Sequence, residues 1–262
     1  MLTRTIEDAI TKEIMVKKLK QLGVRTGMVL ETHIAMSGFG YVIGSAQAVV
    51  DALIECLGYD GTLVMPMQDA NNCDPTIWDN PPIDHALHQM VRDYTPAFHR
   101  KESDGVEMGA VVNNFRRRDG VIVSNNPSLA YAAWGKYAKL ICDHHALHFS
   151  LGEESPIAKM YELEAGVLMI AVPYSKCTCM HLAEYRSQYR PIVLQGAAVE
   201  INGQRVWKKY LDIDLNSQIF NEVGLEMEKK IKIERTMIGK AEAKLFKMKA
   251  AVDFTTDYLR AK

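Results

Sequence analysis

Hydrophobic and polar positions change their spacing twice near the start of the chain. Residues 28–33 are rich in apolar and β-favouring side chains, which predicts a strand. From Ser45 onward the apolar positions recur at helical spacing, which predicts a helix. Ser45 can cap its first turn, and Gly58 can end it in a left-handed backbone conformation. Residues 63–66 then predict another strand. A strand, a loop, a helix and a strand in this order are the unit of a parallel α/β sheet.

The loop between the first strand and the helix contains Gly38, Gly40 and Gly44. Backbone N–H groups at a helix start are unpaired, and glycine lets a ligand approach them closely. The expected ligand is therefore an anion such as a phosphate. The spacing of these glycines matches neither the dinucleotide fingerprint nor the Walker loop. From the residues alone, a phosphate site and an ordinary β–α turn both remain open.

The rest of the chain continues the α/β pattern. Residues 68–84 are rich in Asp, Asn and Pro and predict a loop, and residues 198–207 predict a β-hairpin with Asn202-Gly203 in a type I′ turn. Further helices are predicted at residues 11–23, 109–118, 135–142, 178–189, 215–230 and 241–260, and further strands at 121–123 and 166–172. No internal repeat or low-complexity linker interrupts the pattern, which favours one compact domain over residues 1–262.

Composition narrows the class of protein. A chain of 262 residues can bury one sizeable core, and a formal charge of -1 gives no basic footprint for nucleic acid. No apolar run is long enough to span a bilayer and the first residues lack a signal-peptide core, so a soluble, cytoplasmic protein is expected. The five scattered cysteines do not form a disulfide framework, in keeping with a reducing compartment.

Several blocks of the sequence match motifs of a known protein family. They are Leu22-Gly23-Val24-Arg25, His33, Gly44-Ser45-Ala46-Gln47, Asp60-Gly61-Thr62-Leu63, Asp74-Pro75-Thr76, Met108-Gly109-Ala110, Ala132-Ala133-Trp134-Gly135, Ser155-Pro156-Ile157-Ala158, His181-Leu182-Ala183-Glu184 and Ala241-Glu242-Ala243-Lys244. In this order the chain resembles the aminoglycoside 3-N-acetyltransferase, or antibiotic N-acetyltransferase, family. The resemblance implies an α/β fold: one compact domain with a central, mostly parallel mixed sheet flanked by helices, plus a C-terminal β-hairpin and helices.

The resemblance also implies the ligands. Acetyl-CoA is the expected co-substrate, and the acceptor is a small-molecule primary amine, an aminoglycoside or a related compound, as in antibiotic resistance. No nucleic acid, membrane or metal is expected to take part, and a homodimer is left open. By similarity, the residues expected to hold acetyl-CoA are His33, Ser37, Gly38, Phe39, Val42, Gly44, Ser45 and Met108.

Acetyl transfer to an amine requires a base for the amine proton and a donor that stabilises the thioester oxygen as it becomes negative. His181 stands near the start of a helix that follows a buried strand, where α/β sheets place their sites, and it matches the histidine that is catalytic in the family. A neutral imidazole needs its other nitrogen held. The resemblance assigns that role to Glu228, with Glu226 as the alternative.

The chain departs from the family pattern in three places. His33 is followed by Ile34 and Ala35 where the family has two serines, and Ser175 replaces an aspartate. Where the family has a histidine-rich block, this chain has Asn126-Pro127-Ser128-Leu129-Ala130. A working enzyme with a less cationic acceptor and a family member that binds a ligand without acetyl transfer are both compatible with these changes.

Three other features can be interpreted either as ordinary parts of the structure or as functional sites. Cys177 or Cys179, close in sequence to His181, could form an acetyl-cysteine. His144 and His148 have the spacing of a metal pair but lack an intervening carboxylate, so no metal is predicted. The run 116–118 is all arginine and favours a basic helix end over a site for the 3′-phosphate of CoA.

Overall fold

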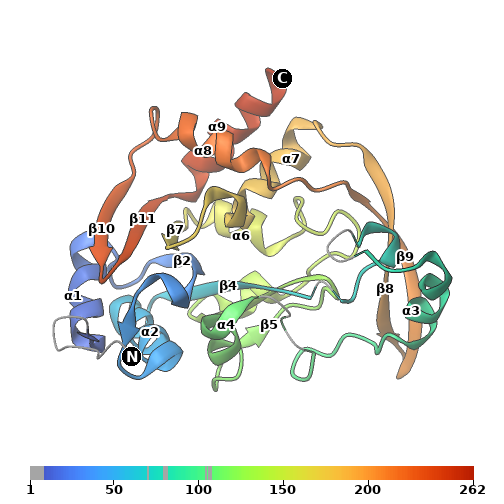
Figure 1. Ribbon diagram of the computed structural model, residues 1–262, viewed down its shortest axis with the longest axis horizontal. Coiled ribbons are helices and arrows are strands. Elements are labelled where there is room, and N and C mark those ends of the chain that lie inside the picture. Colours follow the sequence, from blue (N-terminus) through green and yellow to red (C-terminus); the bar gives the residue numbers. More distant parts are fainter. Residues whose placement is uncertain (1–8, 70, 79–81, 104, 106–107) are drawn as a thin grey trace.

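The computed structural model describes residues 9–69, 71–78, 82–103, 105 and 108–262 (Figure 1). The helices are α1 (Lys12–Leu22), α2 (Ser45–Leu57), α3 (His88–Tyr94), α4 (Gly109–Phe115), α5 (Ala138–Cys142), α6 (Pro156–Glu162), α7 (His181–Ser187), α8 (Ile219–Met227) and α9 (Met248–Arg260). The strands are β1 (Ala9–Ile10), β2 (Val29–Ile34), β3 (Tyr41–Val42), β4 (Thr62–Gln68), β5 (Ile122–Val123), β6 (Leu129–Gly135), β7 (Gly166–Ile170), β8 (Ile192–Ile201), β9 (Gln204–Ile213), β10 (Glu234–Ile238) and β11 (Ala241–Lys247).

A mixed sheet organises the molecule, and within the described residues its strand order is β10-β11-β7-β2-β4-β6-β5. Strands β7, β2 and β4 pair in parallel at its centre. Strands β11 and β6 run antiparallel to their inner neighbours, and β10 and β5 reverse direction once more. Most strands therefore point the same way, which confirms the predicted mostly parallel mixed sheet flanked by helices.

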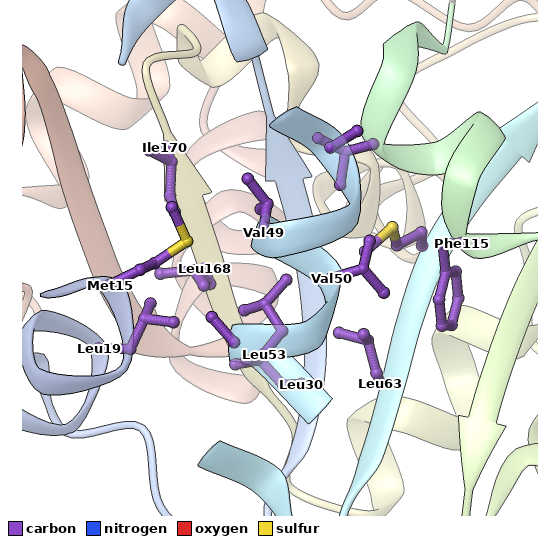
Figure 2. Close-up of a cluster of buried hydrophobic side chains, with 14 of the residues drawn as sticks. Met15, Leu19, Leu30, Val49, Val50, Leu53, Leu63, Phe115, Leu168 and Ile170 are labelled. Atoms are coloured by element: carbon purple, nitrogen blue, oxygen red, sulfur yellow. The ribbon is translucent and has the colours of Figure 1, made fainter. Parts of the chain in front are cut away.

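Two hydrophobic cores cover the two faces of this sheet. On one face α1, α2 and α4 pack against it, and Leu19, Leu53 and Phe115 belong to one cluster with Leu30, Leu63 and Leu168 of the sheet (Figure 2). On the other face the core is built from α5, α6, α7, α8 and α9. Residues from both cores are contributed by alternate positions of the same strands, as burial on both faces of a central strand requires.

The N-terminal caps of the first two long helices agree only partly with those predicted from the sequence. Thr11 caps α1 by accepting a hydrogen bond from the backbone N–H of Ile14 at 3.3 Å. For α2 the cap is Gly44, in a left-handed conformation, and no side chain caps this end. Ser45 is not the cap that the sequence predicts, because it already lies inside the helix with a φ of 52°.

The hairpin of β8 and β9 stands at the opposite end of the molecule from α1 and α2 (Figure 1). Asn202 and Gly203 both have positive φ, as a type I′ turn requires, and the strands run well beyond the predicted residues 198–207. The hairpin holds the segment before α4 in place: Asn72 bonds both backbone groups of Ala198, and Phe98 donates its N–H to the same carbonyl.

The C-terminal region contains the largest difference from the sequence-based expectation. Residues 241–247 form β11, which pairs with β7 and β10, and only α9 of the predicted helix over 241–260 is helical. Alanine, glutamate, lysine and leucine favour helices intrinsically, but pairing with the edge of the buried β7 outweighs that preference. Among the described helices, none has the length and apolarity needed to cross a bilayer.

Candidate active site

A pocket of about 500 Å³ opens at the carboxyl ends of β2, β4 and β7. This is the edge of an α/β sheet where ligands usually bind. Its described lining comprises Thr32, His33, Ile34, Ala35, Met36, Ser37, Pro66, Gln68, Met108, Gly109, Ala110, Val112, Val172, Ser175, Lys176, Thr178, His181 and Ser217. The pocket thus brings residues of β2, the start of α4 and the start of α7 to one place.

His181, the first residue of α7, lines this pocket and is only 8 % exposed. Its Nδ1 lies 2.5 Å from Oε2 of Glu184, one turn further along the same helix. Phe220 packs against the imidazole ring, with ring centroids 4.8 Å apart. The ring is therefore held through Nδ1, and Nε2 is the nitrogen left for chemistry.

Glu184 is itself completely buried and held in place. Its Oε1 accepts a hydrogen bond from the backbone N–H of Asn216 at 3.0 Å, and Nε of Arg190 lies 4.0 Å from the same oxygen. A buried carboxylate is costly unless it is paired and hydrogen-bonded, and both requirements are met here. Glu184 can therefore hold the imidazole and stabilise a positive charge that develops on it.

Glu228 is not the carboxylate that contacts His181, so the predicted pairing is corrected. It follows α8 and accepts hydrogen bonds from the Tyr174 hydroxyl at 2.8 Å and from Lys244 at 2.9 Å, and Arg235 lies 2.6 Å away. Burial raises the pKa of this carboxyl group, but the bonds from Lys244, Tyr174 and Arg235 outweigh it and lower the pKa to about 2. Glu228 is a structural ion-pair partner that joins α8 to β11.

Three of the eight residues expected to hold acetyl-CoA share the pocket with His181: His33, Ser37 and Met108. Phe39 and Val42 belong to the hydrophobic core and are not among the described residues that line the pocket. Both are apolar, and a sequence pattern does not tell an apolar residue that packs from one that contacts a ligand.

The glycines of the loop have separate roles. Gly38 lies where a side chain would meet the Cβ of Ala171 at 2.2 Å, so it allows the loop after β2 to pack against the turn after β7. Gly44 and Ser45 form the start of α2, outside the pocket lining. The uncapped N–H groups of that helix start can still serve a phosphate.

The three places where the sequence departs from the family pattern lie in two different parts of the structure. Ile34, Ala35 and Ser175 line the pocket, so these replacements change its chemistry directly. Asn126 instead shapes the turn before β6, where its Oδ1 accepts the backbone N–H groups of Ser128 and Leu129. The changes at Asn126 and Leu129 therefore act on the turn rather than on the pocket lining.

The thiols near His181 do not form a nucleophilic site. Cys177 and Cys179 are fully buried, with their sulfur atoms 3.5 Å apart, and neither lines the pocket. Burial, then the neighbouring Cys177 and Glu31, raises the pKa of the Cys179 thiol. A buried thiol that stays protonated is a poor nucleophile, which argues against an acetyl-cysteine.

The remaining candidates have structural partners. His144 pairs with Glu154 at the surface, and His148 accepts the backbone N–H of Leu211. Within the described part of the chain, no three His, Cys, Asp or Glu side chains group closely enough to hold a metal ion. Arg118 bonds Asp51 and Arg116 bonds the Ser103 carbonyl, as expected of a helix end that packs against its surroundings.

The comparisons with known proteins agree with this fold. The family model described as aminoglycoside 3-N-acetyltransferase matches residues 32–260. The chain belongs to this family. It is accordingly an acyltransferase.

Individual relatives cover most of the chain. The SPbeta prophage-derived aminoglycoside N(3')-acetyltransferase-like protein YokD of Bacillus subtilis (strain 168) is 38% identical over 93% of this chain and 90% of its own. The crystal structure of YokD covers 97% of this chain and 94% of its own with a TM-score of 0.94 at 36% identity. Aminoglycoside N(3)-acetyltransferase VIII of Streptomyces fradiae is 31% identical over 78% of this chain and 72% of its own.

Proposed function

We propose that this protein transfers an acetyl group from acetyl-CoA directly to a primary amine of an aminoglycoside or a related compound. The observation that carries the proposal is the His181–Glu184 pair, which presents an oriented imidazole to the pocket. Relatives named as aminoglycoside N(3)-acetyltransferases support the substrate class. Acetyl-CoA, the acetyl donor of the family, supplies the group that is transferred.

In this mechanism His181 is the general base. Nε2 takes a proton from the attacking amine while the C–N bond forms, and Glu184 stabilises the imidazolium that results. When the C–S bond breaks, its electron pair stays on sulfur. His181 then returns the proton to the thiolate, so that free CoA and the acetylated amine are the products and the imidazole is again neutral.

The pocket offers suitable surfaces for the donor. Ile34, Met36, Met108 and Val112 form an apolar wall that fits an acyl-pantetheine arm. The uncapped start of α2 provides N–H groups and a positive dipole end for the phosphates of CoA. These two features support binding of acetyl-CoA along the route from α2 to His181.

The charge of the pocket bears on the acceptor. Among the described residues that line the pocket, Lys176 carries a positive charge and none has a carboxylate side chain. A polycation would gain no ion pair from these residues. We therefore favour, among the amines in the proposed class, one with few positive charges.

The test is substitution of His181 by alanine. Wild-type protein should bind acetyl-CoA in calorimetry and acetylate at least one amine in a panel of aminoglycosides and simple primary amines, monitored by thiol release. His181→Ala should keep its affinity for acetyl-CoA within a few-fold and lose about 10²–10⁴-fold in turnover. His144→Ala, a substitution of an exposed surface histidine, serves as the matched control and should retain full activity.

Two outcomes would contradict the proposal. Unchanged turnover in His181→Ala would remove the assigned base. Failure of the wild-type protein to bind acetyl-CoA would favour the alternative, a family member that binds a ligand or partner without acetyl transfer.

A further inference from the structure

The segment that leads into α7 has some residues in the core and others at the pocket. Its short 3₁₀ helix, Thr178–Met180, is followed directly by His181. Cys177, Cys179 and Met180 are completely buried in the core on the α7 side of the sheet. Thr178 and His181 line the pocket instead. The two pocket residues of the segment 177–181 are therefore three positions apart.

This spacing places Thr178 and His181 on one side of the chain. In a 3₁₀ turn the side chains at positions i and i+3 lie directly above one another. The backbone N–H of His181 donates a hydrogen bond to the Thr178 carbonyl, which fixes the two residues relative to each other. Helical positions three apart have Cβ atoms about 5–6 Å from each other. A small group bound next to His181 is thus within reach of the Thr178 side chain.

The hydroxyl of Thr178 is free to bind a ligand. It forms no hydrogen bond with another residue in the part of the chain that the structure describes, and its oxygen is not one of the unpartnered polar atoms that are closed off from solvent. Thr178 as a whole is only 7 % exposed, and the open space that it borders is the pocket. The hydroxyl oxygen is therefore accessible from the pocket.

Other hydroxyl groups of the described lining are less suitable. Oγ1 of Thr32 has no partner either, but this atom is closed off from solvent. Ser37, Ser175 and Ser217 are more exposed than Thr178 and lie outside the turn that leads into α7. Thr178 alone among these five residues combines a largely buried side chain, a free oxygen and a position one turn before the proposed base.

The proposed reaction leaves a role for such a donor. While the amine nitrogen bonds to the thioester carbon, one electron pair of the carbonyl double bond moves onto oxygen. That pair returns when the C–S bond breaks and the bonding electrons stay on sulfur. His181 takes up the amine proton, so the negative charge that develops on the carbonyl oxygen must be stabilised by another group. A threonine hydroxyl can donate at any working pH, because it keeps its hydrogen.

We propose that the Thr178 hydroxyl donates a hydrogen bond to the thioester carbonyl oxygen of acetyl-CoA as that oxygen becomes negative. The inference rests on the proposed function, and it makes Thr178 a catalytic residue beside His181. The hydrogen stays on Oγ1 throughout, since only a hydrogen bond is formed. A β-branched side chain has few rotamers, so little reorganisation is needed during the reaction, which is the condition for an effective donor.

The closing experiment observes the carbonyl group directly and needs no acceptor. Isotope-edited infrared spectra of acetyl-CoA labelled with ¹³C at the thioester carbonyl should show a lower stretching frequency when bound to wild-type protein than in solution. In Thr178→Val, which keeps the shape and removes the donor, the band should return to the solution frequency while calorimetry still detects bound acetyl-CoA. Thr178→Ser, which restores a hydroxyl, should keep the shifted band.

A control and the contrary outcomes complete this test. Thr236→Val changes a threonine of β10 that is outside the described pocket lining and should leave the shifted band in place. A band that stays shifted in Thr178→Val, or an unshifted band in the wild-type complex, would overturn the assignment and leave the proposed function standing. Absence of acetyl-CoA binding by the wild-type protein would remove the proposed function and this inference together, so the two failures are distinguishable.

Kinetics with an accepted amine provide a second readout. Thr178→Val should lower kcat about 10²-fold, with the KM for acetyl-CoA changed by only a few-fold. Thr178→Ser should recover kcat to within a few-fold of the wild-type value, which a role in packing alone would not explain. A rise in KM with kcat unchanged in Thr178→Val would show that Thr178 only binds the donor and would contradict the assignment.

Discussion

Glu184 and Glu228 show how two carboxylates of one chain acquire different tasks. Glu184 stands three residues after His181, and that spacing places both side chains on one side of a helix. The spacing was the signal in the sequence that could have identified the partner. Glu228 is taken instead by Tyr174, Lys244 and Arg235, whose positions depend on three separate elements. Only the folded chain shows that competition.

This difference predicts opposite effects of two matched substitutions. Glu184→Gln should lower acetyl transfer at least about 10²-fold, because the amide can bind His181 in the wrong tautomer. Glu228→Gln should keep activity within a few-fold and lower the free energy of unfolding instead. Turnover assays and urea denaturation of the two variants check this. Equal losses of activity in both would contradict the assigned partner.

The structure places only some of the site residues named from the sequence around one cavity. His33, Ser37, Met108 and His181 are placed at the pocket. Phe39 and Val42 are not, because burial in a core satisfies an apolar side chain as well as a ligand does.

At the scale of elements, strand–loop–helix signals in the first third of the chain were sufficient because the local preferences agree with the fold. The boundaries of β2, α2 and β4 are within a few residues of the predicted ones. Residues 241–247 were predicted as helix, although buried and exposed positions alternate from Ala241 to Lys244. There the strand depends on pairing with β7 and β10, which local composition does not encode.

The contact between the loop after β2 and the turn after β7 gives a prediction at this scale. Gly38→Ala would bring a new Cβ within 2.2 Å of the Cβ of Ala171, so the loop that lines the pocket must shift. We expect a loss of about 1–3 kcal/mol in the free energy of unfolding and weaker binding of acetyl-CoA. Urea denaturation and calorimetry measure the two effects.

A compensating variant tests the cause. Ala171 has a φ of 55°, a conformation that suits glycine, so Ala171→Gly removes the opposing methyl group without backbone cost. Gly38→Ala combined with Ala171→Gly should recover most of the stability and binding. If the double variant is no better than Gly38→Ala, the steric explanation is wrong.

At the scale of the whole molecule, a buried histidine that is not among the described residues lining the pocket couples stability to pH. His145 contacts the Ser124 hydroxyl at 2.8 Å and the Ser150 carbonyl at 2.6 Å. Burial lowers the pKa of His145 to about 4, although the bond to the Ser150 carbonyl opposes this. The folded chain therefore keeps this side chain neutral at pH values where the unfolded chain would protonate it.

The sign of the pH effect follows from that depressed pKa. The contribution of His145 is fully present above about pH 6.5, the unfolded value, and is lost as the pH falls toward about 4. Between pH 7 and pH 5 the free energy of unfolding should fall by about 1–2 kcal/mol from this group. His145→Gln should show a flatter profile in urea denaturation over the same range. Parallel profiles would contradict the prediction.

The placement of His181 and Glu184 on one short helix has a consequence for how such a protein can diverge. The proposed base and the carboxylate that orients it lie one turn apart on α7, so their relative position does not depend on the surrounding loops. Loop residues such as Ile34, Ala35 and Ser175 can therefore be exchanged without separating this proposed proton-transfer pair. If the proposal holds, new acceptors become accessible through small steps, each of which leaves the pair intact.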